Sequence, residues 1–139
     1  MDTKLIKSFI AGIIGTTVMS FIMYVAPMMG IPKMNPPAML AGMMDMPIAV
    51  GWFMHFVVGI IFAVFYVFLF APKITITNKI LKGAAFGFIV FIFAQIAMAM
   101  IGSLMVGMPE PDGAMIGMIL GGILGHVVFG IFVALSVKE

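Results

Sequence analysis

The chain has 139 residues, of which 64% are hydrophobic and 9% are charged. A soluble domain carries about 25% charged residues, so this composition excludes a soluble globular protein and predicts a chain whose apolar surface faces lipid. The net charge of +2 comes from scattered lysines with no arginine, which excludes a nucleic-acid-binding surface, and the lack of cysteine excludes disulfides and thiolate metal sites.

The first apolar run predicts a transmembrane helix at Leu5–Ala26. It is longer than the core of a signal peptide, which has about 7–15 residues, and no small-residue cleavage site follows it. A proline-rich loop comes next, in which Asn35 followed by Pro36 and Pro37 predicts a helix N-cap and a proline-led first turn. The short apolar segment after this cap has roughly nine residues, too few to span, so we expect a helix in the membrane interface.

Three further apolar runs are long enough to cross a bilayer at ~1.5 Å of rise per residue. They predict helices at Ile48–Ala71, Ile80–Met105 and Ala114–Val137, with Pro72 ending the first of them and a turn-rich loop at Gly107–Gly113. The predicted fold is therefore an all-α polytopic membrane protein with four transmembrane helices, which form a single membrane domain over the whole chain, residues 1–139.

The lysines are distributed unevenly across this topology. Six of the seven fall on one side, and Lys33 falls on the other side together with most of the acidic residues. The positive-inside rule then predicts a bacterial inner-membrane protein whose N- and C-termini are cytoplasmic. The six lysines are Lys4, Lys7, Lys73, Lys79, Lys82 and Lys138.

One short motif occurs twice, with a histidine midway between two glycines that lie four residues away on either side. The histidines are His55 and His126, the only two in the chain, and they are 71 positions apart. Over residues 48–63 the same shift gives seven identities in 16 positions without a gap. Because the shift covers two spans, it indicates a parallel repeat of residues 3–71 and 74–139, in which two hairpins are related by an axis along the membrane normal.

Residues four apart share a helix face, so each histidine lies within a stripe of small residues. One interpretation is helix packing, with each imidazole bonded to a carbonyl, a hydroxyl, Tyr24 or Gln95. The other is a ligand site, since a histidine inside a span indicates function, and its most specific occupant is a b-type haem held by both histidines. The cofactor-binding candidates are His55, His126, Gly51, Gly59, Gly122 and Gly130, with His55 and His126 as metal ligands.

Methionine is abundant, with 17 residues gathered mostly in the predicted outer loops and the helix turns beside them. Thioethers suit Cu(I), and Met43, Met44 and Met46 form the densest group, so they are an alternative soft-metal site for copper binding or transport. Methionine also fills irregular apolar gaps, so a methionine-lined cleft for a lipid, a quinone or a partner helix is a further interpretation.

Motifs of hydrolases and transferases are absent from the sequence. There is no Walker loop, no dinucleotide-binding glycine fingerprint, no zinc-protease motif and no nucleophile elbow. Enzymatic activity is therefore expected only as redox chemistry, and only with haem bound. The cofactor-free alternative is a structural or accessory subunit of a larger membrane complex, or a homo-oligomer, in the lipid bilayer.

Several segments carry a family resemblance that extends over nearly the whole chain. They are Ala11–Ser20, Pro37–Met44, Gly51–Gly59 and Gly125–Gly130. Together they resemble a family of small bacterial four-helix membrane proteins of about this length and of unknown function. The resemblance implies the four-helix topology and draws attention to His55 and His126, and it implies no activity.

Overall fold

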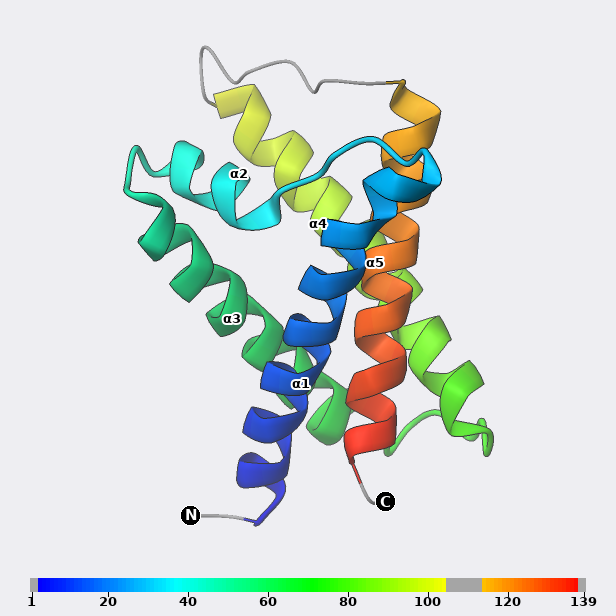
Figure 1. The fold of residues 1–139 in the computed structure, drawn as a ribbon. Helices are drawn as coiled ribbons and strands as arrows, with labels where there is room; N and C mark the ends of the chain where they lie inside the picture. The colour runs from blue at the N-terminus through cyan, green and yellow to red at the C-terminus, as the bar shows by residue number, and fades with distance from the viewer. Residues whose placement is uncertain (1–2, 105–113, 138–139) are drawn as a thin grey trace.

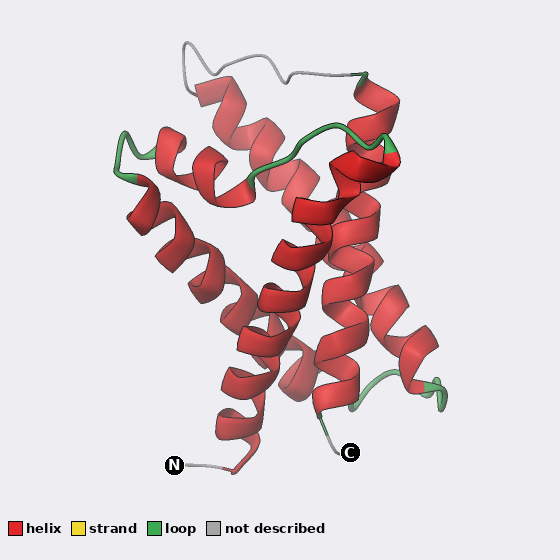
Figure 2. Cartoon of the chain, in the orientation of Figure 1, coloured by secondary structure: helices red, strands yellow, loops and turns green. Residues whose placement is uncertain are grey.

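The computed structural model of the protein describes residues 3–104 and 114–137. Within these residues every regular element is a helix (Figures 1 and 2), and four helices are long and apolar enough to span a membrane. The first spanning helix begins, and the last one ends, at the same end of the bundle (Figure 1). The predicted all-α fold with four spanning helices is confirmed.

The first spanning helix, α1 (Thr3–Val25), continues directly into a 3-10 turn, η1 (Ala26–Met29). The predicted loop began at Pro27, but this proline is the second residue of η1, and its fixed φ is compatible with a helical turn. The turn ends at Gly30, whose φ of 85° lies in the left-handed region that favours glycine. The chain is therefore helical four residues beyond α1.

The short helix α2 (Pro36–Met43) has the predicted cap. The side-chain oxygen of Asn35 accepts a hydrogen bond from the backbone N–H of Ala38 at 3.1 Å, and prolines occupy the first turn. α2 lies across the bundle, at the end opposite the start of α1, and packs against α3 (Figure 1). This orientation agrees with the expectation for a helix in the membrane interface. We refer to this end of the bundle as the α2 end.

The second spanning segment consists of α3 (Ile48–Phe65) and a turn of π-helix, η2 (Tyr66–Phe70). The sequence predicted an uninterrupted α-helix, and the structure differs in its last hydrogen bonds. The N–H of Ala71 donates to the carbonyl of Tyr66, five residues earlier, at 2.8 Å. A π turn contains one more residue than an α turn. The Tyr66 side chain at the start of this turn is fully buried. Pro72 follows, as predicted.

The last two spans, α4 (Lys79–Leu104) and α5 (Met115–Ser136), match the predicted boundaries to within one residue. The ammonium group of Lys79 donates a hydrogen bond to the backbone carbonyl of Val137 at 2.8 Å. This bond ties the start of α4 to the end of α5. The predicted loop at 107–113, with its two acidic residues, lies outside the described residues.

In each hairpin, a glycine lies where the two helices cross and allows their backbones to approach closely. A β-carbon on Gly12 of α1 would lie 2.6 Å from the Cα of Ile60 in α3. A β-carbon on Gly83 of α4 would lie 2.6 Å from the Cα of Ile131 in α5. The second pair is the first pair shifted by 71 positions. The α1–α3 and α4–α5 hairpins therefore make the same contact at equivalent positions.

A neighbouring contact shows how the two crossings differ. Gly59 of α3 faces the hydroxyl group of Thr16 in α1, whereas the equivalent Gly130 of α5 faces the backbone of Gly87 in α4. The Thr16 hydroxyl is buried and has no hydrogen-bond partner in the described part of the chain. It lies where a β-carbon of residue 59 would project, so the Cα–H of Gly59 faces it, as in a Cα–H···O contact.

The two hairpins meet mainly through one of two equivalent interfaces. α1 packs along α5, whereas α3 and α4, which the repeat relates to them, make few backbone contacts. Aromatic rings bridge α3–η2 and α4 away from the α2 end. Phe62 meets Phe93, and Tyr66 meets Phe86, with ring centroids 5.7 and 5.0 Å apart. Nearer the α2 end, the space between α3 and α4 forms a cavity.

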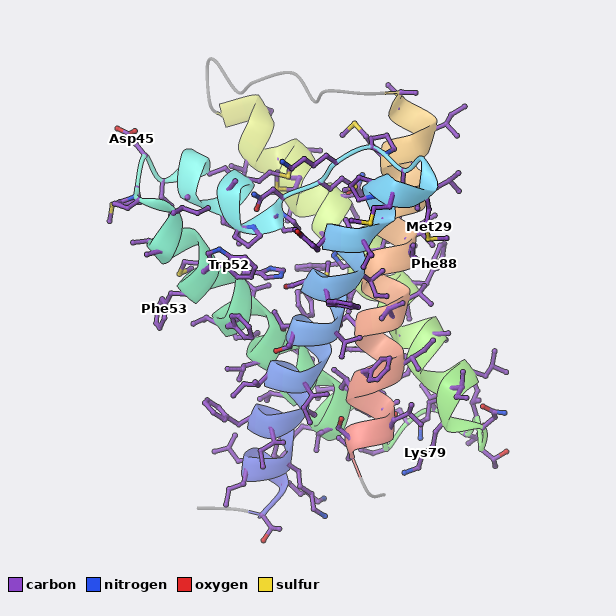
Figure 3. All side chains as sticks on the ribbon, viewed as in Figure 1. Met29, Asp45, Trp52, Phe53, Lys79 and Phe88 are labelled. Atoms are coloured by element: carbon purple, nitrogen blue, oxygen red, sulfur yellow. The ribbon has the colours of Figure 1, made fainter. Side chains whose placement is uncertain are left out.

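The outward faces of the helices are apolar, as lipid contact requires. Phe53 of α3 is 67% exposed and points away from the bundle (Figure 3). Charged side chains lie at the ends: Lys79 is near the end where α1 begins, and Asp45 is at the α2 end (Figure 3). The polar ends and the apolar sides therefore define a membrane protein whose spans run along the bundle.

Candidate ligand site

Both histidines line one cavity. It has a volume of about 170 Å³ and lies between α3, α4 and α5, beneath α2. His55 comes from α3 and His126 from α5, so the structure brings together the two residues that the sequence paired. Apart from these imidazoles and the amide of Gln95, the wall is apolar. Gln95 is exposed, so the cavity reaches the surface beside it.

His126 is oriented by its own helix. Its Nδ1 lies 2.8 Å from the carbonyl oxygen of Gly122, one turn earlier. A carbonyl only accepts hydrogen bonds, so this geometry assigns the proton to Nδ1 and leaves the lone pair on Nε2 of the neutral ring. Histidines that bind metals are commonly held in this way. The ring of Phe91 packs edge-on against the imidazole, with centroids 5.8 Å apart, and restricts its rotation.

His55 is oriented by a neighbouring helix instead. Its Nε2 lies 3.2 Å from the hydroxyl oxygen of Ser20 in α1. Ser20 donates its one proton to the carbonyl of Thr16 at 2.8 Å, so its oxygen accepts and Nε2–H of His55 donates. The lone pair of the neutral His55 ring is then on Nδ1. The two imidazoles thus keep their lone pairs on different nitrogens.

The partners of the two histidines are not duplicated, although the motif is. A shift of 71 positions places Phe91 where the first hairpin has Ser20. A hydroxyl that binds His55 is therefore replaced by a ring that packs on His126. The partner types agree with the sequence-based interpretation, which named a hydroxyl and a carbonyl among the expected ones.

The four candidate glycines lie against other parts of the same chain. Gly51 faces the backbone of α2, and Gly59 faces α1. A β-carbon on Gly122 would lie 2.8 Å from the ring of Phe91, and Gly130 faces the backbone of α4. Gly59 and Gly122 also border the cavity. These contacts correspond to the helix-packing interpretation of the small-residue stripes.

The methionines that the sequence singled out lie apart from the cavity wall. Met43 ends α2, and Met44 and Met46 are exposed in the turn that precedes α3. Four other methionines line the cavity with the histidines. They are Met19, Met34, Met39 and Met98. No local sequence motif could have indicated them, because they come from α1, the loop before α2, α2 itself and α4.

The fold and the cavity define a class: a four-span helical membrane protein with a small cavity, open to the surface, that carries two imidazoles. The sequence model of DUF6789, a family of unknown function, matches residues 3–138, and the chain belongs to this family. The family resemblance seen in the sequence is thereby confirmed. Searches of curated proteins and of solved structures find no match.

Proposed function

We propose that this is a small bacterial inner-membrane protein that binds a ligand between His55 and His126 in the outer half of the bilayer. The observation that carries the proposal is that one imidazole from each hairpin lines the same cavity. Ionisable side chains inside a span are costly and usually serve a function. A hydrogen bond orients each ring and leaves a nitrogen lone pair for a ligand.

The distribution of charge supports cytoplasmic termini. Lys4 and Lys7 lie in the first turns of α1, and Lys79 and Lys82 lie at the start of α4. These turns are at the end of the bundle opposite α2 (Figure 1). By the positive-inside rule this end faces the cytoplasm, so the α2 end and the cavity beneath it face the extracytoplasmic side.

Haem b is the most specific occupant that the duplicated motif suggests. His126 would be able to bind the iron, because its Nδ1–H is bonded and Nε2 has the lone pair. The space fits less well. A cavity of about 150 Å³ holds a single benzene, so the 170 Å³ cavity would have to widen for a tetrapyrrole. His55 would also have to leave Ser20 to coordinate through Nε2. The geometry therefore favours a ligand no larger than a single aromatic ring, or an ion.

The cofactor-free alternative, an accessory subunit that packs on its partners through the glycine stripes, has less support. Gly51, Gly59, Gly122 and Gly130 already contact other parts of the same chain. Their small size is therefore explained without a second protein.

The proposal is tested on the full chain in nanodiscs with three probes: haemin, a short-chain ubiquinone and Cu(I). A visible spectrum of the isolated protein comes first, because bound haem is coloured. We expect one probe to bind, with binding lost in the double variant His55→Ala, His126→Ala. Thr17→Ala is the control, since it removes an exposed hydroxyl that bonds only to its own helix, at Ile13. Binding of no probe, or equal binding by the double variant, would overturn the proposal.

A further inference from the structure

The cavity wall is rich in sulfur. Four methionine side chains line it, and they come from four different segments of the chain. Methionine is flexible and usually fills gaps in apolar packing. Methionines acting only as fillers would close this space, yet a cavity of about 170 Å³ remains among them. The fold therefore brings four methionine side chains to the wall of one open cavity.

Two of these methionines pack against glycines of α5 in the turns before His126. The Sδ of Met34 would lie 3.0 Å from a β-carbon on Gly121, five residues before the histidine. The methyl group of Met19 would lie 3.3 Å from a β-carbon on Gly125, the residue just before it. The Met34 methyl group would also lie 3.9 Å from a β-carbon on Gly122, which is one turn before His126 on the same face of α5.

The donor atoms on the wall select for a soft ion. No Asp or Glu is among the described residues that line the cavity, and the described residues contain no cluster of three or more His, Cys, Asp or Glu. Magnesium and calcium require oxygen ligands, and zinc sites use His, Cys or carboxylates. Neutral thioethers together with imidazole suit Cu(I), whose single charge also limits the cost of entering a membrane interior.

We infer that the histidine cavity is a Cu(I) site, with Nε2 of His126 and thioethers of the cavity wall as its ligands. The inference rests on the proposed function and names the class of ligand. Met39 of α2 lines the cavity and is 42% exposed, so a cavity-wall methionine is also accessible from the surface. His55 also lines the cavity, from α3, and its Nε2–H is bonded to Ser20, so it is not among the proposed ligands.

The experiment is a Cu(I) competition titration of the full chain in nanodiscs, without oxygen, against a chromophoric chelator such as bicinchoninate. We expect one Cu(I) per chain. His126→Ala and the double variant Met34→Leu, Met98→Leu should each weaken binding at least tenfold. Leucine keeps the apolar volume of methionine, and circular dichroism and gel filtration verify folding. X-ray absorption of the loaded protein should show both sulfur and nitrogen ligands.

A matched control removes methionines outside the cavity. The triple variant Met43→Leu, Met44→Leu, Met46→Leu should bind Cu(I) as tightly as the wild type. Loss of binding in this control, with full binding by the Met34 and Met98 variant, would overturn the inference and move the metal to the loop. No Cu(I) binding by the wild type would also overturn it. The proposed function would survive that result if haemin or the quinone bound in a histidine-dependent way.

Discussion

The Nε2–H of His55 donates a hydrogen bond to the hydroxyl oxygen of Ser20, 3.2 Å away on the adjacent helix. This bond connects α1 to α3 at the level of the cavity. The second hairpin has Phe91 at the equivalent position. A phenyl ring can pack against the imidazole of His126, but it has no oxygen that could accept a hydrogen bond from a ring N–H. The two halves thus hold the same side chain through different hydrogen-bond partners, a hydroxyl of the adjacent helix for His55 and a carbonyl of its own helix for His126.

Ser20→Ala removes the acceptor for Nε2–H of His55. We expect a loss of about 1 kcal/mol in the free energy of unfolding, and a shift of His55 toward its Nδ1–H tautomer. Nitrogen-15 NMR of histidine-labelled protein measures the tautomer. Ser136→Ala is the control, because that hydroxyl bonds to the carbonyl of Phe132 on its own helix. An unchanged His55 spectrum in the Ser20 variant would contradict the assignment.

Gly12→Ala and Gly83→Ala should destabilise the protein to a similar extent. Each adds a methyl group 2.6 Å from a backbone Cα of the facing helix, so the helices must separate at a cost of about 1–3 kcal/mol. Unfolding in mixed micelles of sodium dodecyl sulfate measures this cost. Gly42→Ala in α2 is the control, since nothing lies within 4 Å of its added carbon. A large cost for only one of the two crossings would argue against their equivalence.

The buried hydroxyl of Thr16 offers a test by double substitution. Gly59→Ala should be destabilising, because the new methyl group would occupy the position of that hydroxyl. Thr16→Ala removes a buried hydroxyl that has no partner and is expected to be neutral or stabilising. Combined with Gly59→Ala, it should recover about 1 kcal/mol of the loss. Additive effects of the two substitutions would show that these residues do not meet.

The predicted orientation can be read with single cysteines, because the chain has none of its own. Met46→Cys lies at the α2 end, just before α3, and Thr77→Cys lies in the link before α4. We expect a membrane-impermeant maleimide added to intact spheroplasts to label residue 46 and not residue 77. Both should react after the membrane is permeabilised. The opposite labelling pattern would reverse the orientation and place the cavity on the cytoplasmic side.

The spans could be predicted from the sequence because their signals are local. Hydropathy located the four helices, and Asn35 with its prolines located α2. The π turn at Tyr66 was missed, since it depends on how an aromatic side chain is buried between helices and not on neighbouring residues. The continuation of α1 past Pro27 was missed because a proline can begin a 3-10 turn as well as end a helix.

The site was predictable only in part. The repeat paired His55 with His126, since a shift across two spans preserves orientation and depth. The duplicated motif did not reveal that Ser20 holds one ring and the Gly122 carbonyl holds the other. It also could not indicate that Met34 and Met98 line the same cavity, because these residues are distant in sequence and meet only after the helices pack.

Two similar hairpins would be expected to present two similar seams to the surrounding lipid. In this protein the seam between α1 and α5 is shut along the bundle, while the one between α3 and α4 is joined by aromatic rings only below the histidines. The side of the bundle formed by α1 and α5 therefore differs from the side formed by α3 and α4. Among the described residues, the cavity that holds the two imidazoles lies on the α3–α4 side, beneath α2, so the two sides of the bundle present different surfaces to a molecule diffusing in the membrane.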